Sequence, residues 1–155
     1  MPHFTVRPAK DSDIPTLINM GREFHKNSNF SDLEFDPLFI DAHFRRLMSR
    51  DACCLLIAVD SSRTIGFISG SASGAMFGPD TIASEDLFYV EPDMRGAKSG
   101  VSTELLRAFC HWAADQGAAR ISIANSAGTD DDKFQRLLET YGFQKAGSVM
   151  YVEIG

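Results

Sequence analysis

Hydrophobic and polar residues follow two different rhythms along this chain. Between 3 and 7 they alternate with a period of two, which predicts a strand, and between 14 and 24 apolar residues recur every three or four positions, which predicts a helix. The run 53–59 is apolar throughout, as in a strand that is buried on both faces. By the same criteria we expect strands at 3–7, 53–59, 64–76, 81–90 and 121–123, and one or two strands between 143 and 154. Helices are expected at 14–24, at 39–48, from 101 to just before Gly117, and at 134–141.

This order of elements predicts a single α/β domain over residues 1–155. Its central sheet should be mixed and mostly antiparallel, with about six to seven strands and about four flanking helices. Only a strand that leads directly into a helix forces neighbouring strands to run parallel, which directs attention to the turns 91–100 and 124–133. Because ligands of α/β proteins bind in such crevices, we expect the site at these turns.

Composition then narrows the class of function. The chain has 15 Lys and Arg against 21 Asp and Glu, and its longest run of bases is the pair Arg45-Arg46, so neither nucleic acid nor a membrane surface is an expected partner. No apolar run approaches the roughly 18 residues of a membrane-spanning helix, and no secretory signal is evident. Three cysteines, two of them adjacent at Cys53-Cys54, suit a reducing compartment, so we expect free thiols and a cytoplasmic location. The four histidines show no paired ligand spacing, and no metal site is expected.

The turn 91–100, EPDMRGAKSG, has the composition of an anion site. Two glycines, small residues and the bases Arg95 and Lys98 precede a helix N-terminus, where free backbone N–H groups and the helix dipole favour negative charge. A phosphate-bearing cofactor would suit this turn, although neither GxGxxG nor the P-loop pattern is present. An ordinary strand-to-helix turn would also use Gly and Pro, so composition alone leaves both interpretations open.

Several segments resemble the GNAT superfamily of acetyl-CoA-dependent N-acetyltransferases, in particular its small phage and bacterial members. The resemblance spans the whole chain and rests on the stretch 87–96 (LFYVEPDMRG), the helical Glu104-Leu105-Leu106 and the closing Tyr141-Gly142-Phe143. Similar stretches also occur at 6–9 (VRPA) and 83–85 (ASE). The resemblance implies a GNAT-type fold and acetyl-CoA as cosubstrate.

The resemblance also implies where acetyl-CoA binds. The superfamily signature Gln/Arg-x-x-Gly-x-Gly/Ala matches at Arg95 and Gly100, while Lys98 stands at the inner glycine, where its side chain must turn away from the pyrophosphate or embrace it. The implied pyrophosphate loop comprises Arg95, Gly96, Ala97, Lys98, Ser99 and Gly100. Backbone groups of Phe88 and Val90 would pair with the pantetheine arm, and Asn125 would lie on the other side of the cofactor.

Acetyl transfer to an amine requires a base, because a primary amine with a pKa near ~10.4 is mostly protonated at neutral pH. Glu85 and Asp86 lie beside the implied acetyl position, and we favour Glu85, since a bulge commonly shifts strand parity near such a site. Both carboxylates could equally be ordinary charges of a strand. Many superfamily members protonate the leaving thiolate with a Tyr at the position of Leu138, and Tyr141 lies one helical turn further on.

Charge placement gives a hint about the acceptor. From Thr64 to Met94 there is no Lys or Arg, whereas five acids occur there, which would attract a cationic amine. The resemblance places the acceptor near the first two helices and their loop, so the candidate residues are Phe24, His25, Phe30, Asp32 and Phe35, each of which could also be purely structural. A homodimer is possible.

Two other hypotheses remain open. The departures at Lys98 and Leu138 would also suit a degenerate module that binds acyl-CoA without turnover. A nucleotide-binding α/β protein unrelated to acyl transfer is the third hypothesis.

Overall fold

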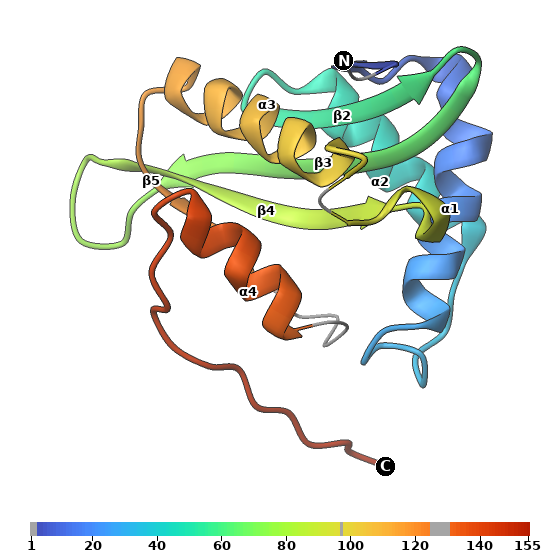
Figure 1. Cartoon of the computed structure of the whole chain (residues 1–155). Helices are drawn as coiled ribbons and strands as arrows, with labels where there is room; N and C mark the ends of the chain where they lie inside the picture. Colours follow the sequence, from blue (N-terminus) through green and yellow to red (C-terminus); the bar gives the residue numbers. More distant parts are fainter. Residues whose placement is uncertain (1–2, 97, 125–130) are drawn as a thin grey trace.

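The computed structural model describes residues 3–96, 98–124 and 131–155, which form a mixed sheet with helices on both faces (Figure 1). Among the described residues the sheet has five strands in the order β1-β2-β3-β4-β5. The strands are β1 (Phe4–Pro8), β2 (Cys53–Asp60), β3 (Arg63–Gly74), β4 (Thr81–Val90) and β5 (Ala118–Ser122). The helices are α1 (Ile14–Lys26), α2 (Pro37–Ser49), α3 (Val101–Asp115) and α4 (Asp131–Thr140), with short 3-10 turns η1 (Asp11–Asp13) and η2 (Pro92–Met94). Neighbouring strands are antiparallel except for β4 and β5, which run parallel.

Each face of the sheet has its own core. The helices α1 and α2 cover one face, where Leu17 and Phe44 pack on Phe67 and other apolar residues of the sheet. The helix α3 covers the opposite face, where Leu105 and Phe109 pack on Ile68. The adjacent cysteines follow this division: Cys53 packs with the first core and Cys54 with the second, as the strand period requires.

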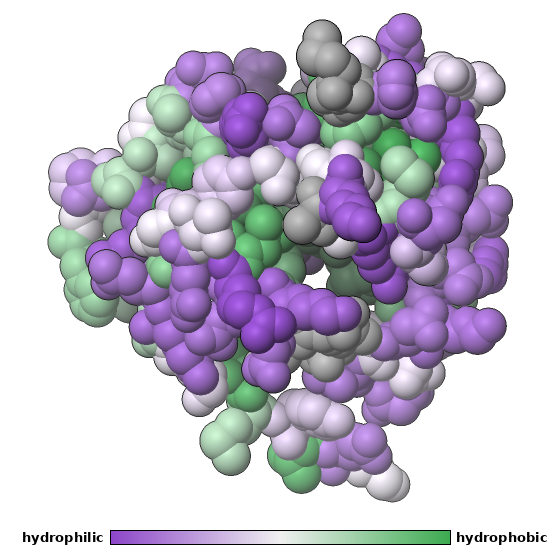
Figure 2. All heavy atoms as spheres, viewed as in Figure 1, coloured by the Kyte–Doolittle hydropathy of each residue, from purple (hydrophilic) through white to green (hydrophobic). Residues whose placement is uncertain are grey.

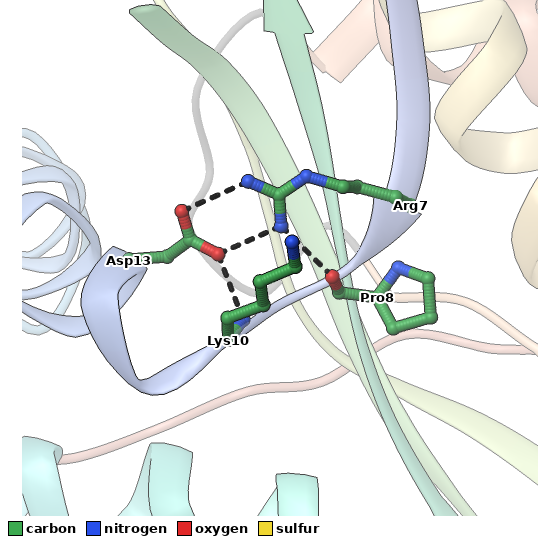
Figure 3. A network of polar contacts seen from close by, with 4 residues as sticks. All are labelled: Arg7, Pro8, Lys10 and Asp13. Carbon is green, nitrogen blue, oxygen red and sulfur yellow. Dashed lines mark hydrogen bonds and ion pairs between the residues drawn. The ribbon is translucent and has the colours of Figure 1, made fainter. Parts of the chain in front are cut away.

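Arg7, at the end of β1, fixes the entry into α1 (Figure 3). Its guanidinium donates to both carboxylate oxygens of Asp13, at 2.8 and 3.1 Å, and holds the pKa of that carboxyl below its ordinary value. Asp13 also accepts from the backbone N–H of Lys10 at 2.7 Å. The acidic segment 11–13 therefore forms a 3-10 turn ahead of the helix. The Asp13 side chain caps the N-terminus of that turn, at Lys10, and makes no capping hydrogen bond to α1.

The prediction of six to seven strands is wrong, because the one or two strands expected between 143 and 154 are not formed. The segment 143–155 has no strand or helix, and it runs away from the body of the protein with Val149 and Ile154 85% and 96% exposed (Figure 1). A strand exists only where a neighbour supplies hydrogen bonds to its backbone, and an apolar run in the sequence does not reveal that neighbour. The other elements lie close to the predicted ranges, although β5 begins three residues earlier than expected.

Candidate active site

A bulge in β4 determines where its two central carboxylates point. Ser69 pairs with Leu87 and Gly70 pairs with Glu85, so Asp86 is the extra residue between two ladder positions. Directly paired residues share a face, and a Cβ built on Gly70 would meet Phe109 of α3, so Glu85 lies on the α3 face of the sheet. Asp86 contacts α2 instead, on the opposite face. The bulge expected from the sequence is therefore present.

Beyond Glu85, β4 and β5 separate. Their parallel ladder ends at the pair Ser84 and Ser122, whereas β4 stays paired with β3 as far as Val90. The N–H groups of Leu87 and Glu91 donate toward β3, to the Ser69 hydroxyl and the Ile65 carbonyl. Backbone groups alternate in direction along a strand, so those of the residues in between, Phe88 and Val90, point to the edge that β5 has left. Such an edge can accept one more extended chain.

Glu85 lies at the point of separation. Its Oε2 accepts from the backbone N–H of Ala124, just after β5, at 3.3 Å, and its carboxyl group is largely buried. Burial, opposed by the Ala124 hydrogen bond and reinforced by the nearby Asp86, raises the pKa of Glu85 to about 7. A carboxylate with that pKa is half deprotonated at neutral pH, as a general base requires.

Asp86 has a different environment, although it is the next residue. Its Oδ2 lies 2.6 Å from Nε2 of His43 on α2, and its side chain is 44% exposed. The two carboxylates thus lie on different faces of the sheet. A buried Glu beside an exposed Asp can take a different role in acid–base chemistry, because burial raises the pKa of a carboxyl group.

The loop between β4 and α3 is ordered by its own hydrogen bonds. Arg95 Nε donates to the carbonyl of Val90 at 2.7 Å, and its guanidinium lies over the ring of Tyr89. The Ser99 hydroxyl donates to Met94 and Gly96 carbonyls and accepts from the N–H of Val101. The loop glycines Gly96 and Gly100 have φ values of 109° and 73°, which side chains rarely adopt, and Gly100 is the N-cap of α3.

The same loop keeps features that suit an anion. The first N–H groups of α3 have no partner inside the helix, and Lys98 is exposed beside them. Two of the candidate cofactor residues, Ala97 and Asn125, lie outside the described residues. Together the open edge of β4 and the start of α3 could hold an extended group that ends in phosphates.

The helix α4 lies against this edge. Phe134 packs edge-on against Phe88, with 5.8 Å between the ring centroids. In Figure 2 apolar side chains lie among hydrophilic ones in the middle of this face, where Figure 1 places β4 and α4, and the surface is hollowed between α4 and α1. Tyr141 follows the end of α4 and is 39% exposed.

Four of the five predicted acceptor residues surround one cavity of about 190 Å³ on the α1 and α2 face. They are Phe24, His25, Phe30 and Phe35. The fifth, Asp32, is exposed and does not line the cavity. The other four lining residues, Gly21, Ser28, Ile40 and Leu87, were not assigned to the acceptor site from the sequence. Ile40 stands in the aromatic-rich second helix, which was the available signal.

The described residues contain no group of three or more His, Cys, Asp or Glu side chains arranged to hold a metal ion. Within the same residues no helix is long and apolar enough to cross a membrane. Cys53, Cys54 and Cys110 are free thiols, and burial raises the pKa of Cys54 to about 12.

Comparisons with known proteins agree with this fold. A transcriptional regulator from Bacillus halodurans C-125 superposes with a TM-score of 0.81 at 15% identity, covering 98% of this chain and 100% of that one. The aminoglycoside 6'-N-acetyltransferase AAC(6')-IG from Acinetobacter haemolyticus superposes at 0.74 with 17% identity, covering 97% and 98%. AAC(6')-Iy, solved with the bisubstrate analogue CoA-S-monomethyl-acetylneamine, superposes at 0.75 with 16% identity and 99% coverage of both chains. No curated protein matches the sequence.

These structural likenesses establish the fold alone. The model of the acetyltransferase (GNAT) family, however, matches residues 19–143, which is most of the sequence. The chain therefore belongs to the GNAT family of acetyltransferases.

Proposed function

We propose that this acetyltransferase moves the acetyl group of acetyl-CoA to a primary amine by direct attack within a ternary complex, with Glu85 as the general base. The position of Glu85 carries the proposal. Its largely buried carboxyl group, with a pKa raised to about 7, lies where β4 and β5 separate. A buried carboxylate that titrates near neutral pH beside an open strand edge is suited to taking a proton from an ammonium group.

The open edge of β4 and the following loop fit acetyl-CoA. The Phe88 backbone and the Val90 N–H point to that edge, and they can pair with the amide groups of the pantetheine arm. The Val90 carbonyl already accepts from Arg95, so this carbonyl is not part of the proposed pairing. The N–H groups at the start of α3 and the side chain of Lys98 would hold the pyrophosphate. The proposed cofactor set also keeps Arg95, Gly96, Ala97, Ser99, Gly100 and Asn125.

Acetyl-CoA supplies a thioester, whose acetyl carbon is the electrophile. The ammonium form of the acceptor first gives a proton to Glu85, directly or through one water, because only the neutral amine can attack. The amine nitrogen then bonds to the acetyl carbon, the carbon–sulfur bond breaks with its electron pair on sulfur, and the nitrogen loses its second proton to the departing thiolate, directly or through water, which gives the amide and the CoA thiol. Backbone N–H groups at the β4 edge can donate to the acetyl oxygen as negative charge develops there.

A dedicated acid for the leaving group is not essential. A thiol pKa of about 8.5 makes the thiolate a fair leaving group at neutral pH. Leu138 stands where many relatives carry Tyr, and Tyr141 is the only candidate from the sequence to replace it. We expect Tyr141→Phe to keep turnover within about a factor of two; a loss on the order of 10²-fold would instead assign the leaving-group proton to Tyr141.

The proposed acceptor is cationic. The segment Thr64–Met94 holds five acids and no base. Two of these acids are already paired, Asp93 with Arg63 at 2.9 Å and Asp86 with His43, so the attraction comes from a partly neutralised group of charges. Asp86 stays 44% exposed and is the carboxylate that can meet an ammonium group on the α1 and α2 face.

An amine panel assayed with acetyl-CoA by thiol release tests the proposal. We expect Glu85→Gln to lower the acetylation rate by about 10²-fold or more and to flatten its rise with pH between 6 and 8. Asp86→Asn tests the other carboxylate, and the variant that removes the pH dependence identifies the base. Glu153→Gln, in the exposed C-terminal segment, is the matched control. An unchanged pH profile in Glu85→Gln would remove Glu85 from the mechanism.

The competing function is a module that binds acyl-CoA without turnover, which the Lys98 and Leu138 positions favour. Tight CoA binding with no acetylation of any amine would support that function over ours. We also propose a cytoplasmic homodimer, because the thiols are free and because large apolar side chains such as Phe77, 96% exposed, stand on the surface. Light scattering after size-exclusion chromatography measures the oligomeric state.

A further inference from the structure

The size and the lining of the cavity on the α1 and α2 face favour a small apolar group as its occupant. Its wall is formed largely by the apolar side chains of Phe24, Phe30, Phe35, Ile40 and Leu87. Its volume is about 190 Å³. An apolar cavity of about 150 Å³ stays dry and takes up a benzene ring, so this one has room for a single phenyl-sized group.

The polar groups of the wall are few. The Ser28 hydroxyl donates to the carbonyl of His25 at 2.8 Å and accepts from the N–H of Phe30 at 3.1 Å, so its hydrogen bonds are made within the loop. His25 Nε2 is buried and has no hydrogen-bond partner among the described residues. A sugar ring with several hydroxyl groups would leave most of them unpaired in such a wall, which is costly, whereas an apolar ring would not.

Leu87 connects the cavity with the proposed site of transfer. It lines the cavity, its neighbour Asp86 lies on the same face of the sheet, and its other neighbour Phe88 presents its backbone to the open edge of β4. The cavity therefore adjoins the strand edge, and a short link joins a ring in the cavity to an amine near Asp86 and that edge.

Building on the proposed function, we propose that the acceptor is a primary amine that carries one phenyl-sized apolar group on a short link. The apolar group occupies the cavity on the α1 and α2 face, and the ammonium group reaches the open edge of β4 past Asp86. There β4 and β5 have separated, and water can carry the proton of the ammonium group to Glu85 on the other face. The bond changes are those of the acetyl transfer described above.

Gly21 provides the test, because it lines the cavity from the middle of α1. A Cβ built there would lie 3.7 Å from Ile40 Cγ1, 3.9 Å from Phe44 Cζ and 4.0 Å from Phe35 Cε2, which is ordinary contact, so a methyl group fits without moving the backbone. Gly21→Val fills part of the cavity, and Gly21→Ala is the gentler variant should the larger one fail to fold. Gly74→Ala is the matched control, since a Cβ there meets nothing within 4 Å.

The first readout is kcat/KM for 2-phenylethylamine, ethylamine and neamine. We expect the wild type to prefer 2-phenylethylamine over ethylamine by about 30-fold, the effect of burying one ring. Gly21→Val should remove most of that preference while the rate with ethylamine and the Gly74→Ala control stay near wild type. Equal rates for the two amines in wild type and variant, or a clear preference for neamine, would overturn the inference and leave acetyl transfer intact.

The second readout does not need turnover. Saturation-transfer NMR on the wild type with CoA should show the ring protons of 2-phenylethylamine in contact with protein, and Gly21→Val or Gly21→Ala should weaken the signal. Ring binding that depends on residue 21, without acetylation of any amine, would support the cavity assignment and reject the proposed function. Absence of a ring signal, or a signal that residue 21 does not change, would reject the cavity assignment.

Discussion

The two faces of the sheet differ in how tightly they are packed, as the space around one glycine on each face shows. On the α3 face, a Cβ on Gly70 would overlap the Ser84 carbonyl oxygen and lie 2.6 Å from Phe109 Cε2. On the α1 and α2 face, a Cβ on Gly21 would find its nearest neighbour 3.7 Å away, beside a cavity. The α3 face has no spare room beside Gly70, whereas the α1 and α2 face has room beside Gly21 and is the face on which we propose that the amine binds.

Gly70→Ala should produce the largest effect on stability. The added methyl group has no room between Phe109 and the β4 backbone, so either α3 or β4 must shift, and we expect a loss of about 3 kcal/mol in the free energy of unfolding. Urea denaturation measures this loss, with Gly74→Ala as the control. A loss below about 0.5 kcal/mol would mean that the α3 face accommodates the methyl group and is not more tightly packed than the other face.

Glu85→Gln should change the pH dependence of stability. The pKa of Glu85 is about 7 in the fold against an ordinary value of 4.5. The carboxyl group therefore contributes its full stabilisation of the folded state below pH 4.5, and that contribution is lost as the pH rises through 7. Glutamine does not titrate, and the variant should therefore gain about 2 to 3 kcal/mol relative to wild type between pH 4.5 and 8. Denaturation at both pH values tests this, and a constant difference would show that Glu85 is not buried.

Gly21→Ala should stabilise the protein. Alanine is the better helix former by about 0.5–1 kcal/mol, and the methyl group enters a cavity without a clash. Thermal unfolding should show a higher midpoint for this variant. A lower midpoint would indicate that the α1 and α2 face is as tightly packed as the α3 face.

Asp86→Asn should have the smallest effect on stability. The pair with His43 is half exposed, and such pairs contribute below about 0.5 kcal/mol. The free energy of unfolding should accordingly change little, in contrast to the effect of Glu85→Gln one residue away. A change as large as that of Glu85→Gln would show that a carboxylate contributes equally to the free energy of unfolding on the two faces.

Most of the fold could be predicted from the sequence because each helix carries an apolar stripe at helical spacing and the first strands are marked either by alternation or by an apolar run between turn residues. The pattern of Val101, Leu105 and Phe109, for example, marks the buried side of α3. The terminal segment was mispredicted because strand formation depends on a partner strand. Exposed Val149 has the side chain of a strand residue but no such partner in the described structure.

The candidate site was only partly accessible to sequence reasoning. The loop aromatics around Phe30 and Phe35 were found together because they are close in the chain. Leu87 was missed because its place in the cavity depends on the bulge, which reverses the face that each residue after Asp86 presents. No local pattern distinguishes Glu85 from Asp86, and only the partners of each side chain, Ala124 and His43, separate them.

The bulge also makes in-frame deletions in the gene unequal. Loss of a codon from the turn 75–80, which joins β3 to β4, would shorten a surface loop and leave every ladder pair in place. Loss of the codon for Asp86 would remove the extra residue of the bulge itself. The side chains of β4 on one side of the deletion would then point to the opposite face of the sheet unless the register with β3 changed. The loss of three nucleotides would therefore be harmless in the turn 75–80, whereas at codon 86 it would disrupt the relation between the cavity on the α1 and α2 face and the open edge of β4.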